Sequence, residues 1–246
     1  MSTTKPTQTP ATTARSPFPA TLTTPIVRGA ACWVLTLTYF VGQAVTQFAV
    51  RTPYSLTTNE ISDLGSTRCG PLTVLTYHAD VCSPLHGVMN GAFIAVGLLT
   101  LLGIIGTRRA WPRRRLTSWG LVFLALGGAG EIVAGLAPEN VNPGLHVCGA
   151  LAAIPGANIG MLLLAGAVWR ARRWTALVSL LCGIVGLSGI VLIVLMGSAP
   201  SAGLGVGTAE RLAAYPFAVW MIVLGVFLLW SATRAPRQHA VVGAVT

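Results

Sequence analysis

Six apolar runs, each about 20 residues long, constrain most strongly what this chain can fold into. Such a run spans the hydrocarbon layer of a membrane when it is helical. Strands fit poorly, because the runs are too long and lack alternation, and only helices satisfy their own backbone over such lengths in lipid. We therefore predict an all-α, polytopic membrane protein with six transmembrane helices in a bundle. The predicted helices are Gly29–Val50, Leu85–Ile105, Thr117–Leu136, Leu145–Val168, Ala176–Met196 and Leu212–Ser231.

Composition supports this class and leaves little chain for anything else. The chain is 53% hydrophobic and 9% charged, whereas a soluble domain carries roughly 25% charged residues. We predict a transmembrane domain over residues 28–232 between two cytoplasmic tails, 1–27 and 233–246. The first tail is rich in Thr, Pro, Ala and Ser and has no apolar period, which favours disorder. The first apolar run is too long for the core of a signal peptide.

The charges predict an orientation. With six crossings, thirteen of the 16 basic residues fall on one side of the membrane, and all 6 acidic residues fall on the other with Arg51, Arg68 and Arg211. The positive-inside rule makes the basic side cytoplasmic, so both termini are predicted to be cytoplasmic in the cell membrane. The net charge of +10 suits anionic inner-leaflet lipids as partners rather than nucleic acid, because no basic soluble domain is present. Tryptophans near the same side predict an interfacial belt of Trp111, Trp119, Trp169, Trp174 and Trp230.

A long outer loop, residues 51–84, is the most informative connection. Within it, Asn59–Gly65 is predicted to form a short helical turn, with Asn59 as the N-cap and Gly65 as a left-handed stop. Cys69 and Cys82 flank twelve residues, and an extracytoplasmic loop permits a disulfide between them, worth about 3 kcal/mol. A metal site at His78, Asp80 and Cys82 is the disfavoured alternative, because it has no recognised spacing.

Several polar residues cluster near the outer boundary of the predicted helices. His86 and Asn90 are four apart and share a helix face, and His146 begins the fourth helix as His86 begins the second. Glu131 lies about five residues inside the third helix, where an acid usually faces a cavity or a partner. The structural alternative is a Glu131 that only locks helices together by pairing with His146, His86 or Arg211.

The combined motifs resemble a known family. Tyr54-x4-Asn59-x-Ile61-Ser62-Asp63-Leu64-Gly65, Cys82-Ser83-Pro84-Leu85-His86-x2-Met89-Asn90 and Pro138-Glu139-Asn140-x-Asn142-x3-His146 resemble the six-helix bacterial membrane family called domain of unknown function 998. The resemblance covers roughly residues 28–232. More distantly, the Ile-Ser-Asp-Leu-Gly box is similar to the Frag1/DRAM/Sfk1 membrane proteins, which are linked to lipid and membrane homeostasis. The resemblance implies six helices and no particular reaction.

The leading functional hypothesis is a site that binds or transforms a lipid or isoprenoid from the outer leaflet. Burial would raise carboxyl pKa values, so that one acid could protonate a prenyl chain and start a cyclisation, or serve hydrolysis or group transfer with a His. The candidate catalytic residues are Asp63, Glu131, His86, Glu139 and His146. The candidate ligand-binding residues are Tyr54, Asn59, Asn90, Asn140 and Arg211.

Two alternatives remain open. The same polar residues could form a structural lock in a scaffold, an accessory subunit or a transporter, although the helices lack the broken pairs typical of transporters. His86 and His146 could ligate a b-type haem, which is disfavoured because membrane histidines more often hydrogen-bond across helices. We otherwise expect no cofactor and no metal. No phosphate loop, nucleophile elbow or zinc-protease motif is present in the sequence.

Overall fold

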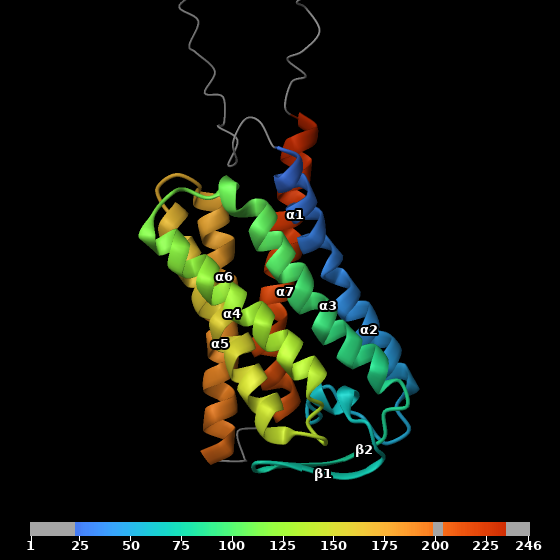
Figure 1. Ribbon diagram of the computed structural model, residues 1–246. Coiled ribbons are helices and arrows are strands. Elements are labelled where there is room, and N and C mark those ends of the chain that lie inside the picture. The colour runs from blue at the N-terminus through green and yellow to red at the C-terminus, as the bar shows by residue number, and fades with distance from the viewer. Residues whose placement is uncertain (1–22, 199–203, 235–246) are drawn as a thin grey trace, which may run out of the picture.

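The computed structural model describes residues 23–198 and 204–234, and these form an elongated helical bundle (Figure 1). Within this part of the chain, six helices are long and apolar enough to cross a membrane. The prediction of a six-helix, multi-pass membrane protein is confirmed at this level. The six spans are Thr24–Ala49, His86–Ala110, Arg115–Leu136, Pro143–Val168, Arg173–Met196 and Val206–Thr233.

The first span consists of two helices, α1 (Thr24–Leu35) and α2 (Leu37–Ala49), with a slight break at Thr36. The helix begins five residues before the predicted start at Gly29, with Pro25 in its first turn, where proline fits because its missing N–H has no helical partner. The predicted tail 1–27 therefore ends too late. Its residues 1–22 lie outside the described part of the chain.

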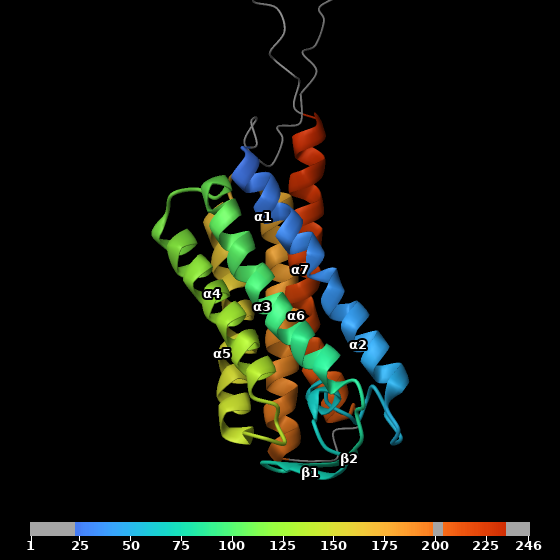
Figure 2. The same ribbon diagram turned by 45° about the vertical axis from the view of Figure 1, so that its right-hand side comes forward.

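The remaining helices alternate in direction, so their connections lie at two ends of the bundle (Figures 1 and 2). We call the end with residues 50–85 and 137–142 the loop end, and the end with residues 108–114 and 169–172 the arginine end. A short 3₁₀ helix, η2 (Arg108–Ala110), lies at the arginine end. The helices are α3 (His86–Thr107), α4 (Arg115–Leu136), α5 (Pro143–Val168), α6 (Arg173–Ser198) and α7 (Val206–Arg234).

The long loop folds into an ordered cap, which we call the clasp (residues 50–85). It contains a 3₁₀ turn, η1 (Ser62–Gly65), and an antiparallel hairpin of β1 (Gly70–Val74) and β2 (Tyr77–Val81), in which Gly70 pairs with Val81. Figure 1 shows the hairpin lying across the loop end. The hairpin was not predicted, although Thr73, Val74, Tyr77 and Val81 are of residue types that are enriched in strands.

An aromatic cluster fills the core towards the arginine end. The rings of Trp33 and Trp220 lie 5.3 Å apart, and those of Trp111 and Trp220 lie 6.3 Å apart. Trp111 is 5% exposed, so its assignment to the interfacial belt is wrong. Trp119, Trp169, Trp174 and Trp230 are exposed, as a belt requires.

Close packing of α4 against α5 positions one polar side chain of the loop end. A Cβ atom on Gly149 would lie 2.8 Å from the backbone nitrogen of Ala134 and 2.9 Å from the carbonyl oxygen of Gly130. Only glycine allows the two backbones to approach this closely. His146, one turn before Gly149, is thereby held against the final turn of α4.

Candidate functional site

A buried polar cluster joins the clasp to the helices at the loop end. We call it the η1 cluster, and it consists of Ser62, Asp63, Glu139, His146 and Glu210. Asp63 and Glu139 are each 2% exposed, and His146 is 6% exposed. The residues come from η1, the α4–α5 loop, α5 and α7. Buried ionisable groups in such numbers need partners, because an unpaired buried charge is costly.

Asp63 is the centre of the hydrogen bonds on the clasp side. Its Oδ2 accepts from the Tyr77 hydroxyl at 2.6 Å and from Asn59 Nδ2 at 2.9 Å. The Glu139 carboxyl also hydrogen-bonds to Asp63, and Glu139 Oε1 accepts from the Ser66 hydroxyl at 3.2 Å. Two carboxyl groups in direct contact require a proton between them.

Burial determines how this pair ionises. It raises the pKa of Glu139 well above its ordinary value, and the charge of Asp63 raises it further. Burial also raises the pKa of Asp63, although hydrogen bonds from Tyr77, Asn59 and Glu139 oppose the rise. We infer that Glu139 holds the shared proton and donates it to the carboxylate of Asp63.

His146 connects α5 to both α4 and the clasp. Its Nδ1 lies 3.1 Å from the carbonyl oxygen of Ala134 and 3.0 Å from that of Ala137, and its Nε2 lies 3.0 Å from the hydroxyl of Ser62. Both ring nitrogens therefore contact protein groups. This geometry does not fit haem ligation by His146, which needs a free ring nitrogen.

Glu210 completes the cluster from the first turns of α7. Its Oε2 accepts from the backbone N–H of Ile61, and its Oε1 lies 3.3 Å from the Ser62 hydroxyl. Glu210 also lies close enough to Glu131 and Glu60 to interact with them electrostatically. Among the described residues, Arg211 is a cation that acts electrostatically on both Glu60 and Glu210.

Arg211 binds the clasp through neutral oxygen atoms. Its guanidinium donates to the carbonyl oxygens of Leu56, Asn59 and Gly207 and, at 2.6 Å, to the hydroxyl of Tyr54. Arg211 is 8% exposed, it makes no ion pair within the described residues, and its buried Nε has no hydrogen-bond partner there. One donor of this cation is thus left for a further acceptor.

A groove of about 460 Å³ lies beside Arg211, between α6 and α7. It extends along α7 from Thr208 to Val219, which is roughly 16 Å at the helical rise per residue. Leu181 is 65% exposed and Val219 43% exposed, so the groove opens on the outer surface of the bundle. It is lined by Leu56, Thr57, Leu181, Cys182, Val185, Thr208, Arg211, Leu212, Tyr215, Pro216 and Val219.

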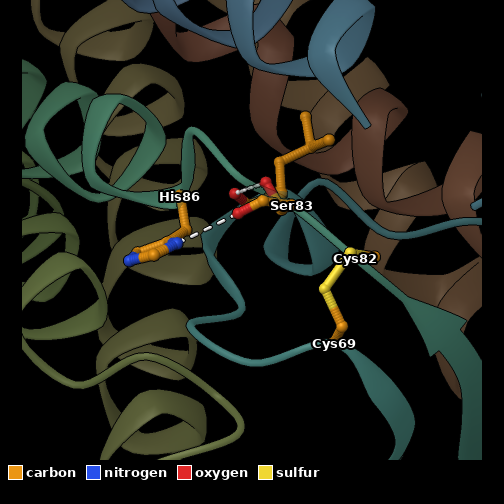
Figure 3. Close-up of a disulfide and its surroundings, with 5 residues drawn as sticks. Cys69, Cys82, Ser83 and His86 are labelled. Carbon is orange, nitrogen blue, oxygen red and sulfur yellow. Dashed lines mark hydrogen bonds between the residues drawn. A yellow bond between two sulfur atoms is a disulfide. The ribbon is translucent and has the colours of Figure 1, made fainter. Parts of the chain in front are cut away.

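Other predicted site residues lie outside the η1 cluster. Glu131 is half-buried and accepts no hydrogen bond from the described residues, and it pairs with none of His146, His86 and Arg211. His86 donates from Nδ1 to the carbonyl oxygen of Ser83 at 3.0 Å (Figure 3). Asn140 forms two hydrogen bonds with Thr67, which tie the α4–α5 loop to the clasp.

The capping roles predicted for the turn are wrong. Asn59 does not cap η1, which has no side-chain cap; it accepts from the backbone N–H of Ser55 and donates to Asp63. Gly65 is not left-handed. It is required instead because a Cβ atom there would overlap Oδ1 of Asn90, whose Nδ2 donates to the carbonyl oxygen of Gly65 at 2.9 Å.

The predicted disulfide between Cys69 and Cys82 is present and closes the hairpin at its open end (Figure 3). The alternative metal site does not form. Cys82 is oxidised, His78 hydrogen-bonds to Thr73, and no group of three His, Cys, Asp or Glu side chains within the described residues could hold a metal.

Four members of the network were missed by sequence reasoning: Ser62, Tyr77, Ser66 and Glu210. A serine or tyrosine in a loop carries no distinctive local pattern, and only its spatial neighbours reveal its role. Glu210 offered a weak signal, because it begins an apolar helix directly beside Arg211.

The fold and the site define a multi-pass membrane protein with a buried polar cluster at one end of its bundle. Comparison with known families matches residues 34–227 to the family described as "Protein of unknown function (DUF998)", and the chain belongs to this family. No curated protein and no solved structure matches the chain.

Proposed function

We propose that this protein binds a membrane lipid or isoprenoid, with the hydrocarbon chain in the α6–α7 groove and the polar end at Arg211. The observation that carries the proposal is the groove itself. Its walls are largely apolar, it opens on the surface of two membrane-spanning helices, and one end meets a buried cation with an unused donor. A groove with such apolar walls that follows α7 for about three turns suits an extended chain better than a compact polar solute.

Charge indicates what the polar end of the ligand offers. Arg211 is held by neutral acceptors only, so its positive charge is not neutralised by direct ion pairing within the described residues. A phosphate or ester oxygen at this end of the groove would contact the guanidinium of Arg211, which lines it. Glu210 of the η1 cluster precedes Arg211 on α7 and lies close enough to interact with it electrostatically.

Native mass spectrometry in mild detergent tests the proposal. We expect a lipid-sized or prenyl-sized adduct on the wild-type protein that is lost in Val185→Trp, because the larger side chain fills the groove. Leu177→Trp is the matched control, since Leu177 is 49% exposed on the same helix and does not line the groove. An adduct retained in Val185→Trp would refute binding in this groove.

A non-catalytic role is the second candidate, and one observation favours it. Most members of the η1 cluster are buried and hydrogen-bonded to one another, as a lock between the clasp and the bundle would be. In that case, replacing the carboxyl groups by amides would lower stability and leave lipid binding unchanged.

We further propose that the loop end faces the extracytoplasmic side. The arginine end carries Arg108, Arg109 and Arg170 among other cations, which favours a cytoplasmic position beside anionic lipids, and a disulfide suits an oxidising compartment. In a background without the free cysteines Cys32, Cys148 and Cys182, Thr76→Cys should react with a membrane-impermeant maleimide in intact cells, and Arg109→Cys should not. The reverse pattern would invert the topology.

A further inference from the structure

The contacts of His146 determine where its proton lies. Nδ1 faces the carbonyl oxygens of Ala134 and Ala137, and carbonyl oxygens only accept, so Nδ1 must carry the hydrogen. In the neutral ring, Nε2 is then an acceptor. The group at Nε2 is the Ser62 hydroxyl, 3.0 Å away. Ser62 therefore donates to an imidazole nitrogen, as an activated serine nucleophile does.

The end of α4 orients this imidazole. The last carbonyls of a helix lack intrahelical partners and carry partial negative charge, which favours a cation beside them. Ala134 belongs to the last turn of α4, and Ala137 follows its final residue. These two carbonyls thus hold the ring in one tautomer and would stabilise an imidazolium, which is the role of the aspartate in Ser-His-Asp enzymes.

The contact of its hydroxyl with an imidazole distinguishes Ser62 from the other two buried serines of the clasp. The hydroxyl of Ser66 donates to Glu139 at 3.2 Å, and that of Ser83 donates to the carbonyl oxygen of Leu64 at 2.7 Å. Neither contacts a base of suitable strength. Ser62 also has a second acceptor, Glu210 Oε1 at 3.3 Å, but a single hydroxyl hydrogen cannot serve both, and the contact with His146 is shorter.

We propose that Ser62 is a nucleophile, that His146 is its general base, and that the substrate class is an acyl ester of a membrane lipid. This inference rests on the proposed lipid site and adds the reacting atoms. Ser62 Oγ bonds to the acyl carbon while its proton moves to His146 Nε2. The ester C–O bond then breaks, and His146 returns the proton to the leaving alcohol. Water, or an acceptor alcohol, cleaves acyl-Ser62 by the same steps in reverse and restores the serine.

The groove and the nucleophile are connected through adjacent residues of α7. Arg211 lines the groove and donates to the carbonyl oxygen of Asn59, while Glu210 contacts Ser62. A chain in the groove with its polar end at Arg211 lies beside the carbonyl oxygen of Asn59, three residues before Ser62, and the proposal requires its ester to reach Ser62 from there. Ser62 is 7% exposed, so the rate of its modification also reports movement of the clasp.

Labelling of the full chain in detergent with an alkyl fluorophosphonate tests the inference. We expect the probe on Ser62, located by peptide mass spectrometry, and a rate about a hundredfold lower in His146→Gln, which removes the base. Ser83→Ala is the matched control, because the Ser83 hydroxyl bonds to neither His146 nor a carboxyl group, and it should label at the wild-type rate. Absence of label on Ser62 in the wild-type protein, or an unchanged rate in His146→Gln, would overturn the inference.

A second variant keeps the test decisive if His146→Gln does not fold. Ser62→Cys, a thiol beside a base, should react with iodoacetamide at least about tenfold faster than Ser66→Cys, which has no base. Equal rates would overturn the inference. Lipid binding is measured separately, by the adduct. If Val185→Trp loses the adduct but still labels at Ser62, the variant has changed the groove and left the nucleophile intact. Ser62→Ala should keep the adduct.

Discussion

The hydroxyl of Ser62 lies 3.0 Å from Nε2 of His146 and joins residues 84 positions apart in the sequence. The same interface contains the bonds from Ser66 to Glu139 and between Thr67 and Asn140. The clasp is therefore attached to the bundle by a buried polar network as well as by apolar residues such as Ile61 and Leu64. Buried polar networks are sensitive to the loss of a single partner.

The proton assigned to Glu139 predicts unequal effects of two amide substitutions. Glu139→Gln keeps a donor towards Asp63 and an acceptor for Ser66, so we expect it to change the free energy of unfolding by less than about 1 kcal/mol. Asp63→Asn can keep an acceptor for Tyr77 and Asn59 only by turning its NH2 group towards the protonated Glu139, where two donors then meet, and it should cost about 1–3 kcal/mol. Unfolding followed by tryptophan fluorescence in detergent measures both. The opposite order would place the proton on Asp63.

The free energy of unfolding should fall as the pH rises, because the folded state keeps the Glu60 carboxyl protonated. Burial, with the charges of Glu210 and Asp63, raises its pKa from 4.5 to about 9. The folded state then keeps a proton that the unfolded state releases, so this contribution is complete below pH 4.5 and is lost as the pH approaches 9. Glu60→Gln should reduce the fall of Tm across that range. An identical pH profile in the variant would contradict the assignment.

Reduction of the disulfide should loosen the clasp. In the chain-entropy model, a loop of this length contributes about 3 kcal/mol. We expect a lower Tm for the double variant Cys69→Ser, Cys82→Ser and for wild-type protein in reductant. Cys148→Ser is the control, because Cys148 is a free, exposed cysteine and its replacement should leave Tm unchanged. A control that fell equally would place the effect outside the clasp.

Gly65 should not tolerate a methyl group. A Cβ atom there would overlap Asn90 Oδ1, so Gly65→Ala should cost about 1–3 kcal/mol by overpacking. Gly87 lies in α3 with open space around it, and Gly87→Ala should be neutral or stabilise by up to about 1 kcal/mol. Thermal unfolding of the two variants makes the comparison, and equal Tm values would show that Asn90 can move aside.

The six-helix architecture was determined by the sequence itself. Apolar length is a local property, and lipid leaves the backbone few alternatives to a helix. The bounds of the clasp, 50–85 against the predicted 51–84, followed from the same runs, and the pair Cys69–Cys82 followed from two cysteines in one loop. The starts of helices were less predictable. The first span begins at Thr24 and Pro25, which lie outside the apolar run that predicted it.

Tertiary structure alone decided which polar residues meet. Asp63, Glu139 and His146 converge, whereas His86 hydrogen-bonds within its own turn and Glu131 has no hydrogen-bond partner among the described residues. The reason is that convergence depends on the distance between helix axes and on their rotation. Both are decided by glycine contacts such as Gly130–Gly149 and Gly65–Asn90, whose partners are distant in sequence. Ser62 is therefore a candidate nucleophile only because the folded chain packs the clasp against α5.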